Sequence, residues 1–88
     1  MSTPYEKGVR WEREVRRILT LHGWRVIRAT GSKPIDLVAF RPGRVPLVIE
    51  CKFNRSPSKA MVGAMRQLGL SCGFRYLVVS RKNKRRKH

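Results

Sequence analysis

The chain has 88 residues, the length of one small domain, and 41% of them are hydrophobic, enough for a modest core. Its 21 Lys and Arg against 5 Asp and Glu give a net charge of +16, which favours a polyanionic partner because nothing in the chain neutralises so much positive charge. We expect that partner to be nucleic acid; an anionic membrane surface or an acidic protein is the less favoured alternative.

Other classes of protein are excluded by simple features of the chain. It contains no apolar run long enough to span a bilayer, and charged residues follow its N-terminus where a secretory signal would be apolar, so we expect a cytoplasmic protein. Two cysteines and two histidines show no zinc-ligand spacing. We expect Cys51 and Cys72 to be buried, reduced thiols.

Residues 5–22 carry the spacing of an amphipathic helix, with Pro4 in its first turn and Gly23 after its end. Three- and four-residue steps draw one apolar stripe, formed by Gly8, Trp11, Val15, Ile18, Leu19 and His22. The opposite face is a row of arginines, either solvated or in contact with phosphate: Arg10, Arg13, Arg16 and Arg17.

Three strands and a second helix are expected next. The strands cover 24–29, 35–40 and 47–53, separated by turn-prone segments rich in Gly and Pro. Ser56 resembles an N-cap before a helix over 57–70, which Gly69 and Gly73 would end.

A fourth strand over 74–80 completes the order α-β-β-β-α-β, which predicts an α/β fold with a mixed β-sheet flanked by helices. We expect residues 1–80 to form the single domain. Residues 81–88 hold six Lys or Arg and no apolar side chain, and we expect a disordered arm that clamps DNA, or else a solubilising tail or nuclear address.

The few acidic residues are informative because a phosphate-binding protein should avoid carboxylates near its ligand unless they do chemistry. If the hairpin after residue 40 has a three-residue loop, facing residues sum to 86, and Asp36 lies opposite Glu50. Two opposed carboxylates repel each other unless a cation lies between them, and Mg²⁺ or Mn²⁺ is the hard ion that fits.

Two further residues complete this predicted site. Lys52 lies on the same face as Glu50, two residues along the strand, where an ammonium can orient water or stabilise charge on a phosphate. Glu12 lies at the edge of the helix's apolar stripe, facing the sheet. Its alternative is an ordinary boundary position with an ion pair to Arg16, one turn on.

This constellation resembles the PD-(D/E)XK nucleases, and within them the archaeal-type Holliday junction resolvases and their viral relatives. The likeness covers roughly residues 7–53 and rests on Lys7-Gly8, Glu12-Arg13-Glu14, Gly23-Trp24-Arg25-Val26, Arg28-Ala29-Thr30-Gly31-Ser32, Asp36-Leu37-Val38-Ala39 and Val48-Ile49-Glu50-Cys51-Lys52. It implies a restriction-endonuclease-like sheet and a metal-dependent endonuclease that cuts four-way DNA junctions symmetrically, a function in recombination and repair.

The resemblance also implies roles for single residues. Glu12, Asp36 and Glu50 would serve an Mg²⁺ or Mn²⁺ site, with Lys52 as the motif lysine and Ser32 near the scissile phosphate. Arg13 and Arg28 match arginines of the family. Together with other basic residues they make up the DNA-binding set that we expect: Arg10, Arg13, Arg28, Lys33, Arg55, Arg81, Lys82, Arg85 and Arg86.

A two-fold symmetric homodimer would match the symmetry of a four-way junction. The second helix carries Met61, Val62, Met65 and Leu68 toward one side, for a second copy or for ordinary packing.

Two alternatives remain at this point. The compact VRR-NUC nucleases share Asp-Leu, Glu-X-Lys and a later glutamine like Gln67. A basic nucleic-acid-binding protein without catalysis explains the charge equally well.

Overall fold

The computed structural model describes residues 3–29 and 35–82. The predicted order α-β-β-β-α-β is confirmed, with α1 (Pro4–Leu21), β1 (Arg25–Arg28), β2 (Leu37–Phe40), β3 (Leu47–Phe53), α2 (Lys59–Cys72) and β4 (Arg75–Arg81). Among the described helices, none is both long and apolar enough to cross a membrane.

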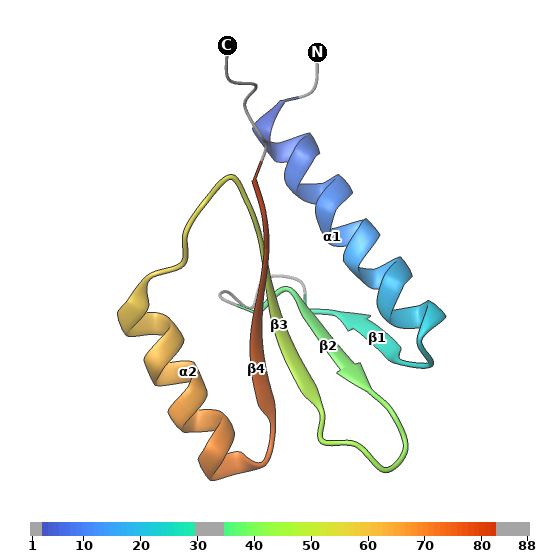
Figure 1. Cartoon of the computed structure of the whole chain (residues 1–88), viewed down its shortest axis with the longest axis vertical. Helices are drawn as coiled ribbons and strands as arrows, with labels where there is room; N and C mark the ends of the chain where they lie inside the picture. Colours follow the sequence, from blue (N-terminus) through green and yellow to red (C-terminus); the bar gives the residue numbers. More distant parts are fainter. Residues whose placement is uncertain (1–2, 30–34, 83–88) are drawn as a thin grey trace.

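The four strands form one mixed sheet in the order β1-β2-β3-β4. β1–β2 and β2–β3 are antiparallel, whereas β3 and β4 are parallel and joined through α2. α1 and α2 lie on opposite sides of the sheet, so the chain has three layers (Figure 1). The start of α1, the connection from β3 to α2 and the end of β4 all lie at one end of the molecule (Figure 1).

The register predicted for β2 and β3 is confirmed, although the expected three-residue loop is wrong: β2 ends at Phe40 and β3 begins at Leu47, so the connection is longer. Leu37 pairs with Ile49, and Val38 with Val48, so facing residue numbers sum to 86. This register decides which side chains of β3 face each helix, because a slip of one residue would turn every side chain over. Leu37 and Ile49 are fully buried on the α1 side.

The cluster between α1 and the sheet also contains Val15, with Trp11 and Leu19 packed against it. These three residues confirm the predicted apolar stripe of the helix. Ile18, which belongs to the same stripe, is 41% exposed, so the helix buries only part of it. α1 begins with a capping box, in which Thr3 and Glu6 exchange hydrogen bonds between side chain and backbone.

On the other side of the sheet, α2 packs over β3 and β4 through a cluster of Val48, Met65 and Tyr76. The expected N-cap is wrong by two residues: Ser58, not Ser56, caps the helix, and its Oγ accepts from the Met61 N–H at 3.3 Å. The extra residues are needed because the chain must cross from the end of β3 to the far face before α2 begins.

The expected end of α2 at residue 70 is short by two residues: Gly69 lies inside the helix, which continues to Cys72, and of the two expected breakers Gly73 ends it, in a left-handed conformation. Cys72 is exposed rather than buried, and Cys51 is half-buried; no disulfide joins them. The burial expected of Cys72 fails because it lies in the last turn of α2, beyond the buried Gly69 and outside the packed clusters.

Candidate nuclease site

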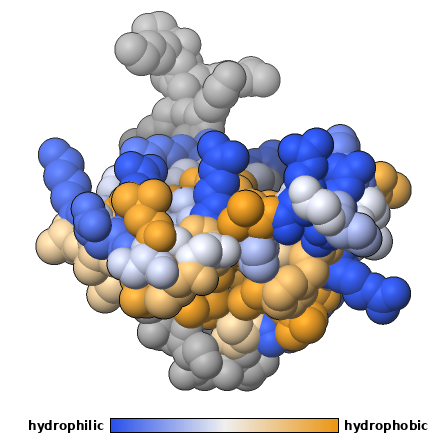
Figure 2. Space-filling model, turned by 90° about the horizontal axis from the view of Figure 1, so that it is seen from below, coloured by the Kyte–Doolittle hydropathy of each residue, from blue (hydrophilic) through white to orange (hydrophobic). Residues whose placement is uncertain are grey.

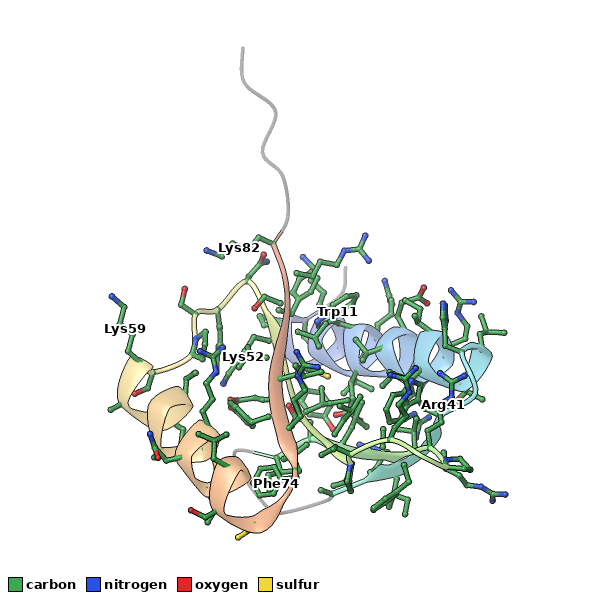
Figure 3. All side chains as sticks on the ribbon, turned by 60° about the horizontal axis from the view of Figure 1, so that its bottom comes forward. Trp11, Arg41, Lys52, Lys59, Phe74 and Lys82 are labelled. Atoms are coloured by element: carbon green, nitrogen blue, oxygen red, sulfur yellow. The ribbon has the colours of Figure 1, made fainter. Side chains whose placement is uncertain are left out.

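One open cleft of about 860 Å³ lies between the first half of α1, the end of β3 and the start of α2. Three separate parts of the chain place residues on its walls. α1 contributes Glu12, β3 contributes Glu50 and Lys52, and the segment directly before β2 contributes Asp36. All four residues predicted as the acidic and lysine core of the site therefore line the same cleft. Lys52 lies between the sheet and α2, whereas Trp11 lies on the α1 side (Figure 3).

Asp36 is held by the backbone on both sides. Its own N–H donates to the Ile49 carbonyl and its carbonyl accepts from the Ala29 N–H, both at 2.9 Å. Its carboxylate Oδ2 accepts from the Cys51 N–H at 2.6 Å. A charge-assisted bond of this kind fixes the carboxylate next to the strand that carries Glu50.

Glu50 is the one buried acid in the described part of the chain, with 6% of its surface exposed. Its Oε2 lies 3.0 Å from the Lys52 ammonium, and its Oε1 accepts from the Tyr76 hydroxyl. A buried carboxylate is tolerated only when it is paired and hydrogen-bonded, and these two partners satisfy both oxygens.

Glu12 is paired across elements rather than along its own helix. Its Oε2 lies 2.8 Å from Nε of Arg28 on β1, so the alternative pairing with Arg16 is wrong. The Glu12 side chain is 17% exposed and that of Arg28 is 51% exposed. Arg28 thus holds Glu12 at the rim of the cleft while part of the guanidinium still faces solvent.

The half-buried Cys51 thiol lies close enough to these acids for their charges to affect its pKa. Burial raises its pKa to about 12, and the charges of Asp36, Glu12 and Glu50 add to that rise. Burial, followed by the hydrogen bond to Glu50, likewise raises the pKa of Tyr76 above its ordinary value, which keeps the hydroxyl protonated as a donor.

The donor set consists of carboxylate oxygens, which fits a hard divalent cation such as Mg²⁺. In the described residues, however, no three acidic, histidine or cysteine side chains gather closely enough to hold a metal ion. Each acid already has a partner: Arg28 for Glu12, the Cys51 amide for Asp36, and Lys52 with Tyr76 for Glu50.

The described residues of the predicted DNA-binding set lie on several elements, and one of them, Arg55, lines the cleft. Arg10 and Arg13 lie exposed on α1, and Arg55 lies on the cleft wall after β3. Arg81, the first residue of the predicted tail, belongs to β4 and lies 5.6 Å from the ring centre of Trp11, and the exposed Lys82 follows it. Ser32, Lys33, Arg85 and Arg86 lie outside the described residues.

The sequence did not indicate the contact of Tyr76 with Glu50, nor a second groove beside the cleft. The sequence predicts Tyr76 only as part of a strand, because nothing in it tells which residue of β4 lies beside Glu50. A second groove adjoins the cleft and shares Lys7 and Phe53 with it. Trp11 contributes to this groove, and its indole N–H donates to the Val79 carbonyl at 3.1 Å. Gln67 is exposed on α2 and does not line the cleft.

A mixed sheet between two helices, in this element order, is the restriction-endonuclease-like fold of the PD-(D/E)XK nucleases. The family model described as archaeal Holliday junction resolvase (hjc) matches residues 3–67. The chain belongs to this family.

Individual relatives agree with this assignment. The chain is 50% identical over 52 residues to the crossover junction endodeoxyribonuclease Hjc of Methanocaldococcus jannaschii, a match that covers 59% of this chain and 38% of that protein. It thus spans well under half the length of this curated relative.

Two solved structures resemble the fold. Archaeoglobus fulgidus Hjc, a Holliday junction resolvase, matches with a TM-score of 0.68 at 28% identity, over 90% of this chain and 67% of that one. A Silicibacter pomeroyi protein of unknown function, SPO1766, matches with a TM-score of 0.57 at 29% identity, over 90% of this chain and 53% of that one.

Proposed function

We propose that the chain is an Mg²⁺-dependent, structure-specific endonuclease that resolves four-way DNA junctions by paired, symmetric hydrolysis of phosphodiester bonds. The observation that supports this most strongly is the convergence of Glu12, Asp36, Glu50 and Lys52 on one cleft in a chain of net charge +16. The positive charge attracts DNA, while the carboxylates are concentrated where hydrolysis would take place.

Asp36 and Glu50 are the proposed ligands of Mg²⁺ or Mn²⁺, since both present carboxylates to the cleft. When bound, such an ion supplies Lewis-acid catalysis, neutralising charge on the scissile phosphate and acidifying water. With such an ion bound, the Lys52 ammonium, which lies 3.0 Å from Glu50, would hold a phosphate oxygen or orient the attacking water.

The ion pair between Arg28 and Glu12 would be broken when DNA binds. An incoming phosphate competes with Glu12 for the guanidinium of Arg28, which is already half exposed. Glu12, released from this pair, turns its carboxylate to the cleft as a third acid. Ser32, which lies outside the described residues, takes the place near the scissile phosphate that the family resemblance implies.

The remaining basic residues of the set bind the DNA backbone. Arg10, Arg13 and Arg55 are exposed around the cleft, and Lys82 lies beyond the end of β4. Lys33, Arg85 and Arg86, which lie outside the described residues, belong to the same proposed set of DNA contacts. Phosphate contacts of this kind position the duplex arms without reading sequence.

The proposed active form is a homodimer. On the sheet face that bears α2, the helix covers β3 and β4, whereas Ile27 and Phe40 of β1 and β2 are 57% and 43% exposed. Met61 and Leu68 of α2 are 41% and 48% exposed. Hydrophobic surface also lies between hydrophilic side chains at the end of the molecule seen in Figure 2. Contiguous exposed hydrophobic surface marks interaction sites, and these exposed side chains support the proposed dimer.

The first prediction tests the site assignment. Asp36→Asn and Glu50→Gln should each reduce Mg²⁺-dependent cutting of a synthetic four-way junction by about 100-fold or more, because each removes a carboxylate ligand of the proposed ion that would neutralise charge on the phosphate. Binding of the junction, measured by gel shift without metal, should be retained. Glu14→Gln is the matched control, since Glu14 pairs with Arg17 and does not line the cleft.

Several outcomes would contradict the proposal. Cutting that persists in both variants would show that the site lies elsewhere. A wild-type protein that binds junctions but cuts no DNA with Mg²⁺ or Mn²⁺ would be a binding module, and equal cutting of linear duplex would indicate a VRR-NUC-like specificity. The native mass of the same sample should be that of two chains.

A further inference from the structure

Tyr76 lies in the part of the chain beyond the residues that match the family model, which end at residue 67. It stands on β4, paired with Val48 in the parallel register, and only 4% of its surface is exposed. Its ring packs with Val48 and Met65, and its hydroxyl donates to Oε1 of Glu50. The ring is therefore fixed by packing while its polar end reaches a residue of the proposed site.

The two oxygens of Glu50 have partners of different kinds. Oε1 is bound by Tyr76, an aromatic side chain locked in a core cluster. Oε2 is bound by Lys52, whose long side chain belongs to the cleft wall and carries a mobile charge. A cation that enters the cleft can replace Lys52, but it cannot replace Tyr76 without opening the core.

We propose that Tyr76 is a positioning residue that holds the Glu50 carboxylate so that Oε2 alone faces a divalent cation, with Lys52 occupying that place beforehand. This inference rests on the proposed metal-dependent function and adds a residue to it. Mutation of a group that orients a metal-ligating side chain by a hydrogen bond typically weakens metal binding by about 10- to 100-fold.

The test is the affinity of the metal-free protein for Mn²⁺, measured by calorimetry or by the electron paramagnetic resonance of free Mn²⁺, without DNA. Tyr76→Phe keeps the ring and removes only the hydroxyl, and it should weaken Mn²⁺ binding about tenfold. In a Glu50→Gln background the same change should have no further effect, because the carboxylate it orients is gone.

Trp11→Phe is the matched control. It removes another hydrogen bond that anchors β4, from the Trp11 indole to the Val79 carbonyl, on the opposite face of the sheet. This variant should bind Mn²⁺ like the wild type. Circular dichroism of all variants should show the same fold.

A second measurement separates weaker metal binding from a general loss of the folded structure. A high concentration of Mg²⁺ should restore junction cutting by Tyr76→Phe. Unchanged Mn²⁺ affinity in Tyr76→Phe, or an equal loss in Trp11→Phe, would overturn the inference while leaving the proposed nuclease intact. A wild-type protein that binds no Mn²⁺ would overturn the proposed metal-dependent function, and the role of Tyr76 with it.

Discussion

Single residues in this protein differ sharply in how their charge is compensated. Glu6 and Glu14 are solvent-facing acids whose pKa values are lowered by local hydrogen bonds, from Thr3 and Arg17 respectively. Glu50 is instead enclosed between β3, β4 and α2, where removal of one partner leaves a buried charge incompletely paired. Such losses commonly cost about 3–5 kcal/mol, far more than the loss of a surface pair.

The two cysteines should differ in reactivity in metal-free buffer. Cys72 is exposed, whereas the Cys51 thiol is half-buried and its pKa is raised to about 12, so little of the reactive thiolate exists at neutral pH. A thiol reagent at pH 8 should label Cys72 at least about tenfold faster than Cys51. The labelling rate of Cys51 should rise as the pH approaches its pKa.

The variant Cys72→Ser isolates the slow thiol, and unfolding in guanidinium should abolish the difference. Two equally fast thiols in the folded protein would contradict the described environment of Cys51.

For single residues, strand periodicity and the register of β2 and β3 were enough to predict that Asp36, Glu50 and Lys52 would line one site. Glu12 could also be placed, since its angle on the helix depends only on its spacing from Trp11 and Val15. Its partner Arg28 and the contact from Tyr76 to Glu50 could not be predicted, because both join segments whose relative register is set by tertiary packing.

At the scale of elements, Gly69 shows how a helix and the next strand constrain each other. It is buried in α2, and a Cβ built on it would lie 2.5 Å from the carbonyl oxygen of Phe74. The glycine therefore lets β4 begin directly against the helix that precedes it. Gly63, on the same helix, has open space around its Cα.

These two glycines make a matched pair for unfolding measurements. Gly69→Ala should destabilise the protein by roughly 1–3 kcal/mol, because the backbone must shift to admit the methyl group. Gly63→Ala should stabilise it by up to about 1 kcal/mol, since alanine favours the helix and meets no obstacle. Urea denaturation of both variants checks the opposite signs; equal effects would contradict the close approach at Gly69.

Element types and their order were predictable throughout the described chain because each segment has a clear period and turn residues at its ends. The ends of α2 were not. Two serines and two glycines fit the rules for caps equally well, and the path from β3 across the sheet edge selects Ser58 and Gly73. Local preferences thus determine the elements, while packing determines where α2 starts and stops.

At the scale of the whole molecule, a chain of net charge +16 places three of its five acids in one cleft. DNA binding should therefore weaken steeply with salt, as bound phosphates release their counterions. Removal of residues 83–88 takes away Lys84, Arg85, Arg86 and Lys87 and leaves β4 complete through Arg81.

The truncated protein should show a salt dependence of junction binding that is shallower by up to about 0.9 per lost phosphate contact. The affinity is measured over a series of salt concentrations, with the thermal unfolding curve as the control for an intact sheet. An unchanged slope would show that these four charges do not touch DNA.

The position of Tyr76 after the three acids of the cleft has a consequence for synthesis. A ribosome delivers Glu12, Asp36 and Glu50 well before it delivers β4, the strand that pairs in parallel with β3 along its full length. Until β4 pairs with β3, the Glu50 carboxylate lacks the hydrogen bond from Tyr76. A nascent polypeptide that has emerged only through residue 53 thus carries the three acids of the cleft before the strand that fixes Glu50 is available.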